Sequence, residues 1–300
     1  MSNYWAITQL PDYPSPMEQI AENIYIETAY EGVNVGAVIT GQGIIAIDAP
    51  TYPRQARDWA MRLQTLSPRP VIFTILTDYH SDRILNARWL NAPIITHRVT
   101  AEKLDNYIKR YPANLLENMA ARNPYRSREA MSGTVEKAAV SFTKSFHLHN
   151  GGVHLQLLAA PGPTSGNLWV HLPAKGILFT GDTFTTGQHP LLLEPVSHQW
   201  LQTLQRLDNW PHTLHAIVPG RGDLQTENST APICNYLQQM QAQVKSHVME
   251  GKTREETAVY IPEFLELFPT DNLPLDWLRQ QIKCSLDHIY DEIQLAGRAA

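Results

Sequence analysis

Four short segments of the chain gather residues that could bind a metal ion or move a proton. They read TDYHSDR (77–83), APGPTSGN (160–167), FTGDTF (179–184) and VPGRGD (218–223). Carboxylates and neutral imidazoles are common ligands of zinc, iron and manganese, and a carboxylate can also accept a proton from water. The segments therefore predict a polar site with metal-binding or acid–base chemistry.

The first of these segments lies at the end of a predicted buried strand. Residues 20–49 read as short β-branched strands separated by turn formers, which indicates an antiparallel meander. Apolar residues at helical spacing predict a helix over 54–66, and the continuous apolar run 70–77 predicts a strand buried on both faces. This strand ends directly at Asp78, so the polar residues that follow it are expected at the edge of a sheet.

The second half of the chain returns to strands after a helical region. A short helix is expected at 84–90, followed by a helical insertion over 100–130 that is broken at Pro112. Strands return from 140 to 182, in a layout that resembles the first meander. From about residue 230 the pattern is helical, with helices over 232–250 and about 275–295. Two halves of this kind predict a layered α/β sandwich with a helical tail packed on it.

In order, spacing and strand context, the four segments resemble the motifs of the metallo-β-lactamase superfamily over roughly residues 20–225. In that family the four motifs read Thr-His-x-His-x-Asp-His, Pro-Gly-His-Thr-x-Gly, Gly-Asp and Pro-Gly-His-Gly. The resemblance implies an α/β fold, a four-layer αββα sandwich over residues 1–228, with a C-terminal helical extension over 229–300. It also implies a hydrolase that uses two metal ions to activate a water molecule.

Several positions of this chain depart from that motif set. Of the matched positions, His80, Asp82 and Asp182 keep the family residue type. Four others hold Asp78, Arg83, Pro163 and Arg221 in place of histidine. Proline has no side-chain donor atom, and a guanidinium group is always protonated and cannot bind a metal, so a normal two-metal site is excluded.

Two interpretations of this site remain open. Asp78, His80 and Asp182 could bind one zinc, iron or manganese ion, with Asp82 as the proton acceptor, which would give a mononuclear hydrolase of unknown ester, amide or thioester substrate. Alternatively, no metal is bound and ion pairs such as Asp82 with Arg221 replace it. The protein would then be a non-catalytic member that binds a small anion or serves as a scaffold, and whether it is an enzyme stays open.

Composition narrows the class of partner. The net charge is −5 and no run rich in Lys and Arg occurs, so a nucleic-acid partner is not expected. The N-terminal residues 1–16 lack the basic and apolar regions of a secretory signal, and no membrane segment is visible, so a cytoplasmic location is expected. A small-molecule substrate or ligand remains, in a pocket that residues 104–135 and 185–199 are expected to line.

Other histidines allow a metal site or a simpler interpretation. His147 and His149 alternate on one strand, and His154 lies across an Asn-Gly-Gly turn, so the three could form a surface metal site or be solvated hairpin residues. His189 could reach the pocket, although a loop histidine beside Pro190 is the simpler interpretation.

Overall fold

The first half of the chain forms a seven-stranded sheet whose strands are neighbours in chain order. The protein is described by a computed structural model that covers residues 17–130, 133–227, 229–270 and 273–299. Strands β1 to β4 pair antiparallel, and β4 to β7 pair parallel. The strands are β1 (Glu18–Ala21), β2 (Ile24–Glu27), β3 (Val35–Ile39), β4 (Ile44–Ile47), β5 (Val71–Ile75), β6 (Ile94–His97) and β7 (Ala138–Phe142).

The second half forms a five-stranded sheet in the order β12-β11-β10-β9-β8. Strands β8 to β11 form an antiparallel meander, and β12 pairs parallel with β11. The strands are β8 (Ser145–Asn150), β9 (Val153–Ala159), β10 (Leu168–Leu172), β11 (Ile177–Gly181) and β12 (Ala216–Pro219), and a short 3₁₀ helix (Pro173–Lys175) separates β10 from β11.

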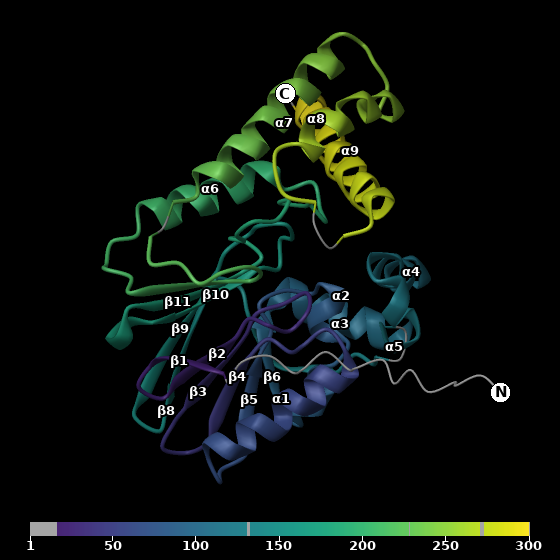
Figure 1. Ribbon diagram of the computed structural model, residues 1–300. Helices are drawn as coiled ribbons and strands as arrows, with labels where there is room; N and C mark the ends of the chain where they lie inside the picture. Colours follow the sequence, from purple (N-terminus) through teal and green to yellow (C-terminus); the bar gives the residue numbers. More distant parts are fainter. Residues whose placement is uncertain (1–16, 131–132, 228, 271–272, 300) are drawn as a thin grey trace, which may run out of the picture.

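The two sheets pack face to face, with helices on both outer faces (Figure 1). The residues of strand β4 are all apolar because both faces of the strand are buried. Ile45 and Ile47 belong to the core between the sheets, whereas Ile44 and Ala46 pack toward helix α1 (Pro53–Leu66) on the other face. The predicted four-layer αββα sandwich is therefore confirmed.

The helices after β5 differ in detail from the expected pattern. The helix expected at 84–90 is divided into two short elements, so that Asp82 and Arg83 lie in the first turn after the strand end. The expected break at Pro112 is confirmed, because proline precedes the first turn of a new helix there. The elements are α2 (Ser81–Ile84), a 3₁₀ helix (Ala87–Leu90), α3 (Arg98–Lys109), α4 (Ala113–Arg122), a 3₁₀ helix (Pro124–Arg126) and α5 (Ser127–Ala130).

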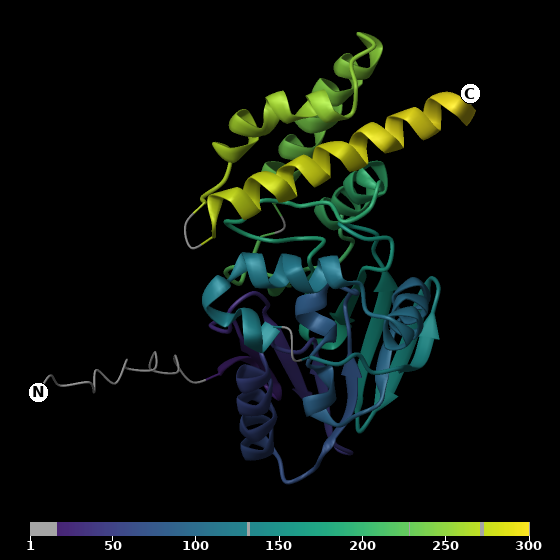
Figure 2. The same cartoon turned by 90° about the vertical axis from the view of Figure 1, so that its right-hand side faces the viewer.

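The remaining helices share a hydrophobic core with the second sheet, and the last one lies across one end of the sandwich (Figure 2). Leu237 and Leu278 share a hydrophobic core with Trp200 and with Leu178 of the sheet, which confirms a C-terminal helical region packed on the sandwich. The boundary near residue 228 stays a prediction. The helices are α6 (Ser197–Asp208), α7 (Ala231–Met249), a 3₁₀ helix (Glu255–Tyr260), α8 (Ile261–Leu265) and α9 (Leu275–Ala299).

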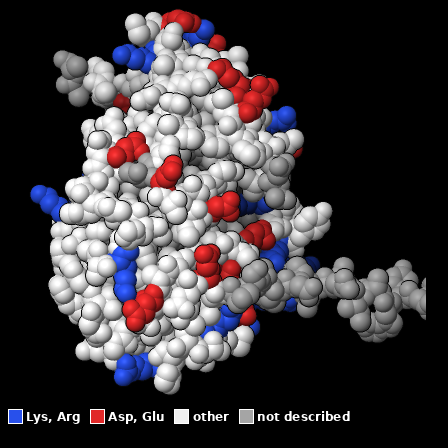
Figure 3. All heavy atoms as spheres, turned by 60° about the vertical axis from the view of Figure 1, so that its left-hand side comes forward, with Lys and Arg blue, Asp and Glu red and all other residues white. Residues whose placement is uncertain are grey.

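The surface agrees with the composition. On the face shown in Figure 3, Lys and Arg side chains are scattered among Asp and Glu and do not gather into a basic patch. Within the described residues, none of the helices combines the length and the apolar character that crossing a bilayer requires. Residues 1–16, on which the expectation about a secretory signal rests, lie outside the described residues.

Candidate functional site

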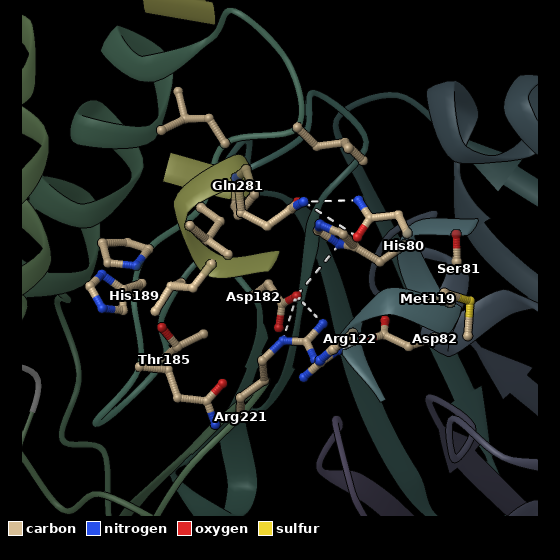
Figure 4. Close-up of a pocket in the computed structure, with 18 of the residues that line it drawn as sticks. His80, Ser81, Asp82, Met119, Arg122, Asp182, Thr185, His189, Arg221 and Gln281 are labelled. Carbon is tan, nitrogen blue, oxygen red and sulfur yellow. Dashed lines mark hydrogen bonds and ion pairs between the residues drawn. The ribbon is translucent and has the colours of Figure 1, made fainter. Parts of the chain in front are cut away.

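The ends of several strands meet at one edge of the sandwich. Asp48 and Asp78 follow the parallel strands β4 and β5, while Asp182 and Arg221 follow the parallel strands β11 and β12. Parallel neighbours end at the same edge, so the polar residues after them converge. Figure 4 shows Asp182, Arg221 and His80 pointing toward one another there.

Asp182 lies between two guanidinium groups. Arg83 donates from Nη2 to Oδ1 at 2.5 Å and from Nη1 to Oδ2 at 2.8 Å. Arg221 donates to Oδ2 from Nε at 3.1 Å and from Nη2 at 2.9 Å. Arg83 is fully buried, and paired bonds of this geometry are among the stronger interactions of a carboxylate. Both oxygens of this predicted metal ligand are thus already hydrogen-bonded.

Asp82 forms ion pairs with Arg122 and with Arg221. Its Oδ2 lies 2.7 Å from Nη1 of Arg122 and 2.7 Å from Nη1 of Arg221. Burial favours the neutral acid, but the charges of Arg221 and Arg122 outweigh it and hold the pKa of Asp82 well below its ordinary range. A carboxylate with a lowered pKa is a weak base, so the geometry does not favour Asp82 as proton acceptor, a role that stays a prediction.

Asp78 and His80 form a tight pair. The Nδ1 atom of His80 lies 2.8 Å from Oδ2 of Asp78 and 3.5 Å from Oδ2 of Asp182. The backbone N–H of His80 donates to Oδ1 of Asp78 at 2.8 Å, and the side-chain Nδ2 of Asn167 donates to Oδ2 of Asp78 at 3.0 Å. Potential ligand atoms of Asp78, His80 and Asp182 all lie within 4.8 Å of one another, so the structure brings the predicted set together.

Asp48 belongs to the same cluster, although its sequence context indicated only the end of a strand. Its carboxylate accepts hydrogen bonds from the backbone and hydroxyl of Thr77, at 2.8 and 2.7 Å, and from Nε of Arg83 at 3.1 Å. Burial raises the pKa of Asp48 to about 6, against the opposing effect of Arg83. Arg83 therefore connects Asp48 on the first sheet with Asp182 on the second.

Two glycines allow this close approach of the strand ends. A Cβ atom on Gly181, whose φ is +53°, would lie 2.6 Å from the hydroxyl of Thr77. A Cβ atom on Gly220 would lie 2.3 Å from Oδ1 of Asp182. A larger residue at Gly220 would push the Asp182 carboxylate away from its arginine partners, and one at Gly181 would displace Thr77, so the site depends on glycine at both positions.

A cavity of about 140 Å³ opens beside the cluster, with His80, Asp182 and Arg221 on its polar side. The expected regions line it through α4 and the loop after β11, whereas the contribution of α9 had no sequence signal because it arises only from tertiary packing. The apolar lining residues are Leu115, Met119, Pro163, Pro190, Leu191, Leu192, Leu193, Trp200, Leu273, Trp277 and Leu278.

His189 lies in a loop beside Pro190, as expected, and is buried in the lining of this cavity. Its ring packs against Tyr236 and Phe268, with centroid distances of 6.1 and 5.6 Å. Burial lowers the pKa of His189 to about 4, so the imidazole is neutral at pH 7. It therefore contributes to the wall of the cavity without adding charge.

The cluster approaches neutrality through its own side chains. Four carboxylates, Asp48, Asp78, Asp82 and Asp182, face three guanidinium groups. Burial disfavours protonated His80, but the charges of Asp78 and Asp182 and the hydrogen bond to Asp78 outweigh it and raise its pKa. Protonation of His80 balances the remaining negative charge.

The ion pairs predict a loss of stability in acid. The pKa values of Asp82 and Asp182 are lowered in the folded protein, so both contribute stability above their ordinary pKa of 3.8 that is lost as the pH falls. Asp48 has a raised pKa of about 6 in the folded protein, so it lowers the free energy of unfolding as the pH rises from 3.8 to about 6. Below about pH 4 the free energy of unfolding is expected to fall by up to ~1.4 kcal/mol per pH unit for each lowered carboxyl group.

Urea unfolding between pH 2 and 7 measures this dependence. The variant Asp82→Asn should show a shallower acid slope, by about one proton, because one lowered carboxyl group is gone. Asp276→Asn is the matched control, since the Asp276 side chain is 96 % exposed and its slope should equal that of the wild type. An unchanged slope in Asp82→Asn would contradict the assigned ion pairs.

Comparison with known proteins identifies the family of this chain. The family model described as the metallo-β-lactamase superfamily matches residues 30–216. The chain belongs to the metallo-β-lactamase superfamily. A search of curated proteins finds no relative of significant sequence similarity.

Several solved structures share this fold at low sequence identity. A metallo-β-lactamase from Pontibacter korlensis is 20 % identical, with a TM-score of 0.58, over 74 % of this chain and 98 % of that one. A metallo-β-lactamase family protein from Thermus thermophilus is 16 % identical, with a TM-score of 0.67, over 91 % and 95 %. The inverting sec-alkylsulfatase Pisa1 from a Pseudomonas species is 13 % identical, with a TM-score of 0.69, over 92 % of this chain and 49 % of its own.

Metallo-β-lactamase motifs bind two metals through histidines, and the residues present here do not fit such a pair. Arg83 and Arg221 stand at two positions where the motifs are expected to hold histidine, and their guanidinium groups contact Asp182 directly. Pro163 lines the cavity and uses its backbone carbonyl to accept a hydrogen bond from Leu193 at 2.9 Å. For a single metal the spacing of Asp78, His80 and Asp182 is suitable, but the adjacent positive charges oppose it.

Proposed function

We propose that this chain is a metal-independent member of the metallo-β-lactamase superfamily that binds a small amphipathic molecule in the cavity beside the motif residues. The observation that carries the proposal is the pairing of Asp182. Its two oxygens accept four hydrogen bonds, two from Arg83 and two from Arg221. A metal at Asp182 would have to displace charge-assisted bonds from groups that remain charged at any physiological pH.

The balance of charge supports the same conclusion. Buried carboxylates require positive partners, because an unpaired buried ion costs several kcal/mol on the order found in proteins. In this cluster Arg83, Arg122 and Arg221 already supply that charge from within the chain. A resident cation would add charge to a cluster that His80 can bring to neutrality with one proton.

The lining of the cavity indicates the chemistry of its ligand. One side presents N–H donors of His80, Arg122 and Arg221, and the other walls are formed mainly by leucine, tryptophan and methionine side chains. Pockets of this kind hold an apolar body by burial and orient it through a few polar contacts. The proposed ligand therefore has an apolar body and one hydrogen-bond-accepting polar group.

A small probe of that chemistry tests the proposal. Benzenesulfonate, which joins one aromatic ring to a sulfonate, should bind with one-to-one stoichiometry in isothermal titration calorimetry, and excess EDTA should leave the affinity unchanged. Met119→Trp should weaken binding at least about tenfold, because the larger side chain fills a cavity whose packing tolerates little added volume.

The control variant is Met61→Trp, since Met61 lies on α1 and is 60 % exposed. It should bind the probe like the wild type. Equal affinities in the two tryptophan variants would overturn the assignment of the cavity, and loss of probe binding in EDTA would overturn metal independence.

A second candidate function is a mononuclear metal-dependent hydrolase, favoured by the proximity of Asp78, His80 and Asp182. In that case a metal would be held by these side chains and would activate a water molecule. This candidate requires about one equivalent of metal that is lost in His80→Ala, whereas the proposed function requires none at these residues.

A further inference from the structure

A group of three histidines lies on the hairpin formed by β8 and β9, away from the motif residues. His147 and His149 alternate along β8 and so face the same side of the sheet. His154 on β9 is the direct cross-strand partner of His149, and it therefore faces that side as well. The strand register thus places three imidazole rings together on one surface.

Contacts between the rings are close. Nδ1 of His147 lies 3.0 Å from Nε2 of His154, and the rings of His149 and His154 stack with centroids 4.2 Å apart. Each residue offers a ring nitrogen within 4.8 Å of the others. Burial and the neighbouring His149 and His147 lower the pKa of His154, so crowding favours the neutral imidazole that metals bind.

We propose that His147, His149 and His154 form a second, surface site for a divalent transition metal, with zinc as the test ion. Three imidazoles with no oxygen ligand suit zinc, copper or nickel rather than magnesium or calcium. Two nitrogens bound tetrahedrally at about 2.0–2.1 Å from zinc lie roughly 3.3–3.4 Å apart, close to the 3.0 Å between His147 and His154.

The third ligand can adjust to complete the site. His147 and His149 are exposed and His154 is half-buried, so rotation of the outer side chains meets little packing resistance. Water would occupy the fourth position, as in other sites with three protein ligands. A bound ion would cross-link β8, an edge strand of the five-stranded sheet, to its neighbour β9.

This site is separate from the motif cluster, and the expected count of one zinc ion also rests on the proposed function, in which that cluster binds none. His154 is the second residue of β9, whereas Pro163 follows the far end of the same strand. Five residues of strand correspond to about 16 Å, so the two groups of side chains lie at opposite ends of β9.

Zinc titration by isothermal calorimetry tests the proposal on the full chain and three variants. Wild-type protein should bind one equivalent, and His154→Ala should weaken binding at least about tenfold by removing one of three ligands. His198→Ala is the matched surface control, because the His198 side chain is 58 % exposed and lies on α6. His80→Ala reports on the motif cluster, and both of these variants should bind zinc like the wild type.

Thermal unfolding provides a second measurement on the same proteins. Zinc should raise the midpoint of the wild type and of His80→Ala, because a ligand that binds only the folded state stabilises it. The shift should disappear in His154→Ala. A wild type that takes up no zinc, equal affinities in the wild type and His154→Ala, or a loss that occurs only in His80→Ala would each overturn the surface site.

Discussion

Replacing Arg83 with methionine is expected to lower the free energy of unfolding by about 3–5 kcal/mol, because it removes one partner of a buried ion-pair network. Arg83 is fully buried and contacts Asp48 and Asp182 directly, at 3.1 and 2.5 Å. Methionine keeps much of the side-chain volume but leaves these carboxylates with too little positive charge. Chemical unfolding at pH 7 measures the loss.

Arg98→Met is the matched control for this substitution. Among the described residues Arg98 forms one ion pair, with Glu102 at 2.9 Å, and its side chain is 58 % exposed. Exposed pairs of this type contribute little, so the control should change stability by no more than about 0.5 kcal/mol. Adding Asp182→Asn to Arg83→Met should cost less than the sum of the two single changes, because the residues interact. Equal losses in Arg83→Met and Arg98→Met would contradict the assigned role.

A second large effect is expected from restoring the family's ligands. The chain with Asp78→His, Arg83→His, Pro163→His and Arg221→His should bind two zinc ions with an affinity at least about a hundredfold above that of its parent. The physical reason is the exchange of two permanent positive charges for two neutral donors beside His80 and Asp182. The parent for this experiment is His154→Ala, so that the surface histidines do not contribute.

Metal analysis and competition with a chromogenic chelator count the bound ions. The control carries Asn, Gln, Ala and Gln at the same four positions, which removes the arginines without adding imidazoles, and it should not take up two ions. Absence of zinc in the histidine variant would show that the strand ends no longer have the spacing that two metals need. In the parent itself, one equivalent of metal that disappears in His80→Ala would favour the mononuclear hydrolase.

The fold and the convergence of the motif residues could be predicted from the sequence, for local reasons. The unbroken apolar runs at β4 and β5 reflect strands with both faces buried, and Asp78 follows the second run directly. Arg83 and Arg221 stand at positions defined by motif spacing, so their proximity to Asp182 followed from the order of the strands.

Other members of the site had no such signal. Arg122 lies in a helix whose position over the strand ends depends on how the insertion packs, and Trp277 reaches the cavity from the tail only through tertiary contacts. Asp48 was recognisable only as the residue after a strand, although its positive φ of 57° and its bonds to Thr77 make it part of the cluster. The spacing of residues in the sequence predicts which side chains are neighbours within one helix or strand. It does not predict which side chain of a distant element will contact them.

The contacts of Arg83 with both sheets have a consequence for the cell. Where a metal ion holds the edges of a fold together, the energy of binding becomes part of the energy of folding, and the amount of native protein follows the available ion. Arg83 makes the same connection with atoms that are present as soon as the chain is synthesised. In the metal-independent protein proposed above, the connection between the two sheets at this edge should therefore not change with the supply of zinc or iron.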